Sequence, residues 1–130
     1  MSIAETLFGV DPRVRYVAVN LDGKIVEMEQ SPRWPSANPS DTDRMEELLV
    51  NPTVIDLVRR RGELDLGGVS YVLIRYGALF QLVTPYRGGH VSVGIEPGPD
   101  VLEVAERCVE AIRSLPGWAT EPSRIPPLSS

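Results

Sequence analysis

Residues Val69–Glu96 read VSYVLIRYGALFQLVTPYRGGHVSVGIE and carry the clearest structural pattern of this chain. The stretch contains three runs rich in strand-forming residues, which are Val69–Tyr76, Leu79–Tyr86 and His90–Glu96. Gly77-Ala78 and Arg87-Gly88-Gly89 separate these runs, and linkers this short allow only tight reversals between strands. The pattern therefore predicts an antiparallel meander of three strands.

A shorter hairpin is predicted before the meander. Val14–Leu21 is rich in strand formers, and Asp22-Gly23 is a favoured two-residue hairpin turn. The chain then returns along Lys24–Glu29, where apolar residues alternate with Glu27 and Glu29. This alternation predicts a half-solvated edge strand, on which the two glutamates act as solubilising charges that discourage edge pairing.

Helical patterns lie before, between and after these strands. Ser2 and Glu5 have the spacing of a capping box at the start of a short helix. A middle helix is expected from Ser40 to Gly62, interrupted and restarted at Asn51-Pro52 because Asn favours the N-cap and Pro the first helical position. Val101–Leu115 has the most regular apolar stripe, and its helix should cover the sheet.

Apolar stripes and a basic triplet mark the middle helix. The residues expected on its buried face are Met45, Leu48, Leu49, Val54, Leu57 and Val58. Arg59, Arg60 and Arg61 are expected in its last turn, where cations offset the helix dipole by ~0.3–1 kcal/mol each. That interpretation of the arginines is favoured, and contact with an anion or an acidic partner is the alternative.

Adjacent apolar positions indicate how the layers are arranged. Val17-Ala18-Val19 and Tyr71-Val72-Leu73-Ile74 are apolar at consecutive rather than alternate positions, which is typical of strands covered on both faces. The predicted fold class is α/β (α+β), a five-stranded antiparallel sheet covered by helices on both faces in the order α-β-β-α-β-β-β-α. We expect one domain in residues 1–118 and a disordered Pro/Ser-rich tail in 119–130.

Composition excludes several classes of function. The chain has 130 residues and a net charge of −5 without a concentrated basic face, so nucleic acid is a poor partner. A single cysteine, Cys108, provides neither a disulfide framework nor a thiolate metal cluster. No apolar run approaches the ~18 residues of a membrane span, and no secretion signal is recognisable, so a cytoplasmic location is expected.

The residues that most often carry chemistry are isolated in this sequence. His90 is the only histidine and has no second ligand or paired carboxylate nearby, so a structural or solvent-facing role is favoured over metal binding or acid–base catalysis. Cys108 lies on the apolar stripe of the last helix and should be buried and unreactive. We therefore predict no catalytic residues, no cofactor and no metal.

The runs VAVNLDGKIVE (17–27) and YVLIRYGALFQLVTPYRGGHVSVGIEP (71–97), followed by a terminal helix, resemble the roadblock/dynein-light-chain family. More broadly they resemble the profilin-like and longin-like folds, over roughly Val14–Leu115. The resemblance implies a non-enzymatic interaction or scaffold module. It also implies a homodimer joined sheet edge to sheet edge, with regulation of a small GTPase as one role.

A long apolar strand without proline or lysine is an aggregation hazard unless another chain covers it. The predicted dimer edge is therefore the first strand of the meander, comprising Val69, Ser70, Tyr71, Val72, Leu73, Ile74, Arg75 and Tyr76. Trp34, Arg59, Arg60 and Arg61 are candidate contacts with a partner, although a tryptophan such as Trp34 more often folds back over the core. The alternative function is a small-ligand sensor with a pocket between sheet and helix, and an enzyme is a third hypothesis.

Overall fold

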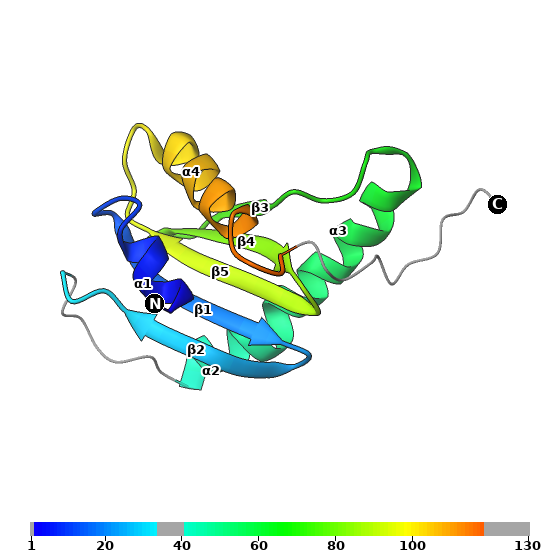
Figure 1. The fold of residues 1–130 in the computed structure, drawn as a ribbon, viewed down its shortest axis with the longest axis horizontal. Helices are drawn as coiled ribbons and strands as arrows, with labels where there is room; N and C mark the ends of the chain where they lie inside the picture. The colour runs from blue at the N-terminus through cyan, green and yellow to red at the C-terminus, as the bar shows by residue number, and fades with distance from the viewer. Residues whose placement is uncertain (1, 34–40, 119–130) are drawn as a thin grey trace.

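The computed structural model describes residues 2–33 and 41–118 (Figure 1). The elements are α1 (Ile3–Phe8), β1 (Val14–Leu21), β2 (Lys24–Gln30), α2 (Asp41–Met45), the π-helical turn η1 (Glu46–Val50), α3 (Asn51–Asp65), β3 (Val72–Arg75), β4 (Phe80–Tyr86), β5 (Gly89–Ile95) and α4 (Val101–Arg113). Because α2, η1 and α3 follow one another without a gap, they form one helical rod. The predicted order of helices and strands is confirmed.

The strands form a five-stranded antiparallel sheet in the order β2-β1-β5-β4-β3. Asp22 and Gly23 join β1 to β2 with φ values of 52° and 81°, the positive angles that a tight hairpin turn of this kind requires. Pairing of β1 with β5 attaches the first hairpin to the meander. The two edges of the sheet are β2, as its alternating glutamates predict, and β3.

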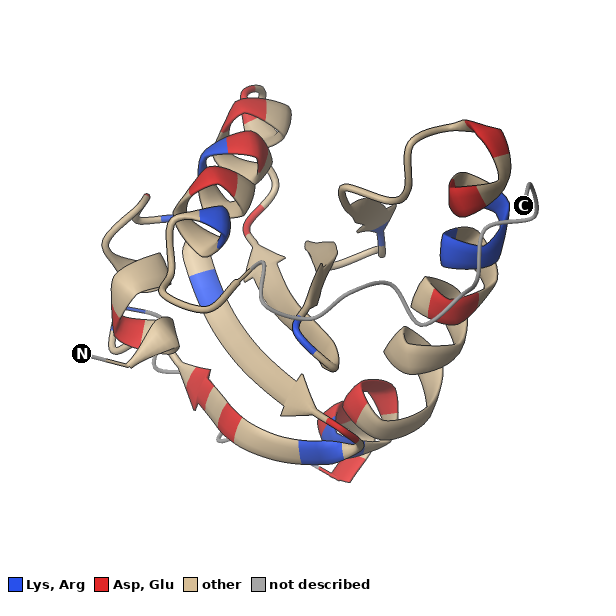
Figure 2. Ribbon diagram, turned by 45° about the vertical axis from the view of Figure 1, so that its right-hand side comes forward, with Lys and Arg blue, Asp and Glu red and all other residues tan. Residues whose placement is uncertain are grey.

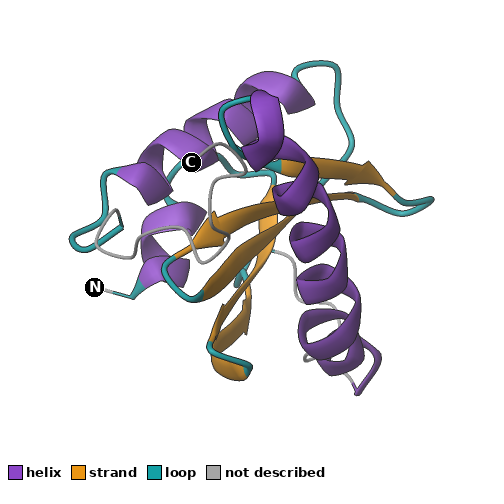
Figure 3. Ribbon diagram, turned by 90° about the vertical axis from the view of Figure 1, so that its right-hand side faces the viewer, coloured by secondary structure: helices purple, strands orange, loops and turns teal. Residues whose placement is uncertain are grey.

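The apolar core lies between one face of the sheet and helices α1 and α4, which lie on the same side (Figure 3). Across four strands, one register row of this face consists of Val17, Val93, Leu82 and Leu73. Helix α4 adds the buried side chains Val104, Ala105, Cys108, Val109 and Ile112. Burial raises the pKa of the Cys108 thiol to about 12, and the predicted burial of this cysteine is confirmed.

The helical rod covers the opposite face of the sheet (Figure 3). Both faces of β1 are covered, since its positions Tyr16 to Asn20 are all buried. Strand β3 is only half-buried and runs from Val72 to Arg75, shorter than the predicted Val69–Tyr76. Cover on both faces is therefore confirmed for β1, whereas β3 is more open than its apolar sequence predicts.

The course of the middle helix differs from the prediction in two places. Asn51-Pro52 does not interrupt it, because the Asn51 N–H donates to the Glu46 carbonyl in a π-type turn and Pro52 falls in the first turn of α3. Gly62 does not end it, since α3 continues to Asp65 before Gly67 turns the chain with a φ of 78°.

The side chains that the rod buries against the sheet also differ from those expected from the sequence. Its buried residues are Glu47, Asn51, Ile55 and Gly62. Of the six residues predicted for its buried face, Met45, Leu48, Leu49 and Leu57 are exposed, whereas Val54 and Val58 are half-buried. The rod meets the sheet through Glu47 and Asn51, whose polar partners lie on the strands and on the rod itself, and this contact turns the leucines outward.

Two charged features also have more specific roles than predicted. The carboxylate of Glu27 accepts hydrogen bonds from the Ile3 and Ala4 N–H groups at 3.2 and 3.0 Å and so stabilises the start of α1. The basic triplet lies before the last turn of α3, and two of its members pair with acids four residues away. Among the described residues, no helix is long and apolar enough to cross a membrane.

Candidate functional site

A buried carboxylate joins the helical rod to the sheet. Oε1 of Glu47 accepts a hydrogen bond from Asn51 Nδ2 at 3.1 Å and lies 2.8 Å from His90 Nε2. Oε2 accepts from the Ser92 hydroxyl at 2.6 Å and the Tyr16 hydroxyl at 3.0 Å. All five side chains are buried. Four polar groups from α3, β1 and β5 thus surround one carboxylate.

The electrostatics of this cluster favour an ionised Glu47. Burial alone would raise the pKa of Glu47, but hydrogen bonds from His90, Ser92 and Asn51 outweigh burial and lower it. Burial and the adjacent Glu47 charge raise the pKa of the Tyr16 phenol, which therefore stays protonated and donates. The carboxylate is consequently held by a complete set of donors.

A histidine, a serine and a carboxylate in contact invite comparison with a catalytic triad. In a triad the serine bonds to the histidine, whereas here the Ser92 hydroxyl donates to Glu47. Ser92 is fully buried, so a substrate cannot reach its oxygen. The geometry fits a structural clamp, and His90 takes the structural rather than the solvent-facing role of the two that the sequence left open.

Sequence reasoning missed this cluster, although the strands carried a signal for it. One face of each strand carries two polar residues, which are Tyr16 and Asn20 in β1, four positions apart, and His90 and Ser92 in β5, two positions apart. In register, Asn20 faces His90, and all four side chains lie on the face toward the rod. A buried row of this kind requires a polar partner, and Glu47 supplies it.

The open edge of the sheet is a second feature that could serve function. Strand β3 pairs with β4 on one side, and no strand of the described residues pairs with its other side. Val72, Leu73 and Ile74 are half-buried, and the strand contains neither proline nor lysine. This edge can therefore accept another strand.

The predicted edge residues before and after β3 are tied to other elements. The Thr84 hydroxyl donates to the Ser70 carbonyl at 2.7 Å, and the Tyr71 hydroxyl donates to Glu106 of α4 at 2.9 Å. At the far end, the Tyr76 hydroxyl donates to Glu46 of η1 at 2.8 Å. Only the central four residues of the predicted edge are thus in strand conformation.

Exposed leucines lie on α3 and on the segment that leads from it to β3. Leu57, Leu64 and Leu66 are 63%, 48% and 64% exposed on α3 and just after its end. A hollow of about 410 Å³ between α3 and the approach to β3 is lined in part by Leu66, Val69 and Val72. We call β3 together with these three leucines the β3–α3 surface.

Charges of both signs accompany these leucines on α3 (Figure 2). Arg60 pairs with Asp56 at 3.2 Å, and Arg61 pairs with Asp65. The four side chains are exposed and sum to zero charge. A surface with balanced charges and an apolar stripe can match a second copy of itself.

Comparison with solved structures shows which known fold this architecture matches. A Roadblock/LC7 domain from Streptomyces avermitilis matches with a TM-score of 0.59 and 19% identity, covering 85% of this chain and 91% of that one. The gliding protein MglB from Thermus thermophilus matches with a TM-score of 0.57 and 14% identity, covering 85% and 84%. MglB in a tetrameric arrangement matches with a TM-score of 0.57 and 13% identity, again over 85% and 84%.

The chain has the Roadblock/LC7 fold. The resemblance inferred from the sequence is therefore confirmed at the level of fold. A scan against protein-family models finds no match, and a search of curated proteins finds none either.

The candidate partner contacts are spread over this Roadblock/LC7 fold. Arg60 and Arg61 lie on the exposed side of α3 near the leucines, whereas Arg59 is half-buried and lines a small hollow beside the β1–β2 turn. Trp34 and the predicted tail 119–130 lie outside the described residues. Of the three arginines, Arg61 lies close to the predicted edge, since it lines one hollow with Val69 and Val72.

Proposed function

We propose that this chain is a non-enzymatic interaction module that works as a homodimer, joined through the β3–α3 surface. The observation that carries the proposal is that β3 has an open edge and that Leu66, 64% exposed, lines one hollow together with Val72 of that edge. Each of these features is unfavourable in a single chain, because an unpaired strand edge promotes aggregation and exposed leucines leave apolar surface in contact with water. A second copy covers both at once.

The geometry of a two-fold pair supports this choice of partner. In an isologous contact the same patch faces itself, and two antiparallel β3 strands can pair across the axis to join the two sheets. Helix α3 covers one face of the sheet and leads into β3, so pairing of the edges would bring the two α3 helices to the same side of the joined sheet. Exposed Arg60 and Arg61 are balanced by Asp56 and Asp65, so these charges would not oppose the contact.

The fold, rather than a site, supports a role in controlling another protein. Many roadblock-like proteins, which the sequence resembles, scaffold or regulate small GTPases, and one structural neighbour is a gliding protein, MglB. Another neighbour is MglB in a tetrameric arrangement. We infer a regulatory or adaptor role, with a small GTPase as the first class of partner to test.

Sedimentation equilibrium of wild type and two leucine variants tests the dimer. Leu57→Glu places a charge in the β3–α3 surface and should weaken the dimer by about tenfold or more, because a buried charge is costly. Leu102→Glu is the matched control, since Leu102 is 57% exposed on α4 at the other side of the sheet. A wild-type chain that remains monomeric at tens of micromolar contradicts the proposal, as does equal weakening by both variants.

A further inference from the structure

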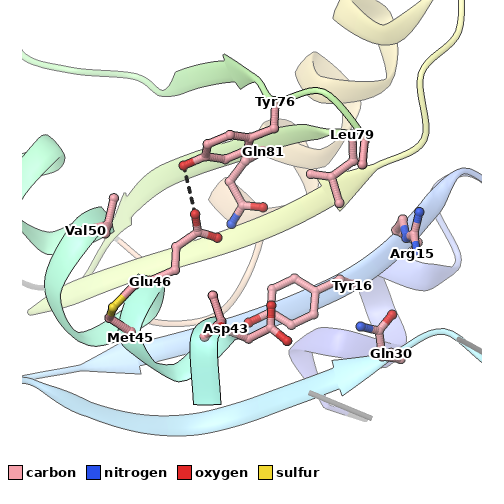
Figure 4. A pocket seen from close by; sticks show the side chains of 12 residues that line it. Arg15, Tyr16, Gln30, Asp43, Met45, Glu46, Val50, Tyr76, Leu79 and Gln81 are labelled. Atoms are coloured by element: carbon pink, nitrogen blue, oxygen red, sulfur yellow. Dashed lines mark hydrogen bonds between the residues drawn. The ribbon is translucent and has the colours of Figure 1, made fainter. Parts of the chain in front are cut away.

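A second hollow lies between the sheet and the start of the helical rod (Figure 4). It has a volume of about 520 Å³, within the range of sites that hold small organic molecules. Its walls come from β1, β2, β4, α2, η1 and the β3–β4 turn. Its lining does not include the three leucines or the strand residues of the β3–α3 surface, so it is a separate feature.

Three residues that line this hollow, Gln30, Tyr16 and Gln81, lie on one register row of the sheet. Gln30 of β2 lies opposite Tyr16 of β1, Tyr16 lies opposite Gly94 of β5, and Gly94 lies opposite Gln81 of β4. Directly opposed residues in antiparallel strands project to the same face. The row therefore places two glutamine amides on one face, with Tyr16 and a side-chain-free glycine between them.

Both glutamines have an unmatched polar atom. Gln81 is 2% exposed, and its Nε2 has no hydrogen-bond partner among residues 2–33 and 41–118. Oε1 of Gln30 is likewise buried and without a partner in that part of the chain. A buried polar group without a partner destabilises the fold, and such a group in a native structure requires an explanation. Both residues line the hollow, so a bound molecule toward which these shielded amides turn could satisfy both.

The rest of the lining restricts the chemistry of that molecule. Apolar surface predominates, supplied by Met45, Val50 and Leu79. The carboxylates are those of Asp43 and Glu46, whereas the one cation of the lining, Arg15, pairs with Glu96. Burial raises the pKa of Glu46, which reflects surroundings that do not stabilise negative charge. An anionic ligand is therefore disfavoured, nucleotides included.

The spacing of the two amides sets the shape of the ligand. Three strand-to-strand steps separate Gln30 from Gln81, or about 14 Å at ~4.8 Å per step. We propose that the hollow binds an elongated, uncharged aromatic amide whose body packs on Tyr16, Met45 and Leu79. A ligand carbonyl accepts from Gln81 Nε2, and a ligand N–H at the other end donates to Gln30 Oε1.

Three matched probes test this chemistry on the full chain labelled with ¹⁵N. They are the 4′-amino derivatives of biphenyl-4-carboxamide, biphenyl-4-carboxylate and biphenyl-4-carboxamidinium, which share one body with an N–H donor at the far end and differ only in the group that faces Gln81. The carboxamide should shift the Gln81 side-chain NH₂ signals and bind about tenfold or more tightly than either charged probe. Equal binding of the carboxamide and a charged probe, or no shift at Gln81, overturns the proposal.

A Gln81→Leu variant separates ligand binding from folding. Leucine fills a similar space without the unpaired amide, so the ligand-free variant should melt at the same or a higher temperature than wild type. Its affinity for the carboxamide should nevertheless fall by about tenfold. Retained affinity in this folded variant contradicts the proposal. The dimer is tested separately, because Leu57→Glu changes no residue of this hollow.

Discussion

Oε1 of Glu47 lies 2.8 Å from Nε2 of His90, and both side chains are buried between η1 and the sheet. The two residues are 43 positions apart in sequence, so this contact fixes the helical rod to β5. The Asn20 amide adds a bond from β1 to the Glu47 backbone carbonyl at 2.9 Å. The position of the rod, and with it the outward direction of its leucines, depends on this one carboxylate.

Glu47→Gln should lower the free energy of unfolding by about 3–5 kcal/mol, the cost of breaking a buried pair while leaving its partners in place. The amide keeps the shape of the carboxylate but offers a donor where Ser92 and Tyr16 also donate. Urea titration followed by circular dichroism measures the change. Glu46→Gln is the control, because Glu46 is only half-buried and its carboxylate accepts from the Tyr76 hydroxyl near the surface. A similar loss in both variants would remove the special role assigned to Glu47.

Glu46 and Glu47 should have opposite effects on how the free energy of unfolding changes with pH. Folding lowers the pKa of Glu47 below its ordinary value of 4.5, so the unfolded chain takes up a proton first as the solution is acidified. The stability that Glu47 contributes is present above pH 4.5 and is lost as the pH falls through the folded pKa. Folding raises the pKa of Glu46, mainly through burial, so the Glu46 contribution falls as the pH rises.

Unfolding free energies measured between about pH 6.5 and 3.5 test this assignment. Glu47→Gln should lose less stability on acidification than wild type, and Glu46→Gln should lose more. The groups around Glu47 that titrate are Tyr16, Glu46 and His90, and Tyr16 stays protonated across this range because its pKa is raised. If wild type and both variants lose the same free energy of unfolding on acidification, the pKa shifts assigned to Glu46 and Glu47 are contradicted.

Periodicity made much of the fold predictable. The apolar stripe of α4 has a single helical period, and short linkers separate the three strand-rich runs of the meander. The structure contains both, with β3 shortened to Val72–Arg75. Consecutive apolar positions in β1 correctly indicated cover on both faces. Local patterns succeed here because the apolar residues that define each of these elements are also the residues that pack into the core.

The middle helix shows where such patterns fail. Met45, Leu49 and Leu57 have helical spacing, but spacing alone cannot tell whether an apolar stripe faces its own sheet or the solvent. The deciding contacts of Glu47 come from strands 31 and 45 residues away, at Tyr16 and Ser92. These tertiary contacts decide which side of the rod is buried. Leu57, on the exposed side, is part of the β3–α3 surface.

The two edge strands allow a test of the dimer that is independent of the leucines. Val72→Lys places a charge on β3 and should weaken self-association by about tenfold or more, because edge lysines oppose strand pairing. Val26→Lys is the matched control on the opposite edge, where Val26 is 54% exposed on β2. Both variants are compared with wild type by sedimentation equilibrium, with circular dichroism to verify folding. If Val26→Lys disrupts the dimer and Val72→Lys does not, β2 is the interface.

Gly62 links the stability of the fold to the shape of the proposed interface. A Cβ at Gly62 would lie 2.9 Å from the backbone carbonyl carbon and oxygen of Gly68, so the segment leading to β3 would have to move. Gly62→Ala should therefore lower the free energy of unfolding by about 1–3 kcal/mol, as overpacking does. It should also weaken the dimer, because the displaced segment carries Leu66 and precedes Val72.

Gly77→Ala is the matched control, since a Cβ at Gly77 would meet nothing within 4 Å among the described residues. Its stability should stay within about 0.5 kcal/mol of wild type, as for most surface changes. Urea titration and sedimentation equilibrium are carried out on both alanine variants. A Gly62→Ala protein as stable as Gly77→Ala would mean that the α3–β3 segment adjusts freely. The edge would then not depend on this contact for its position.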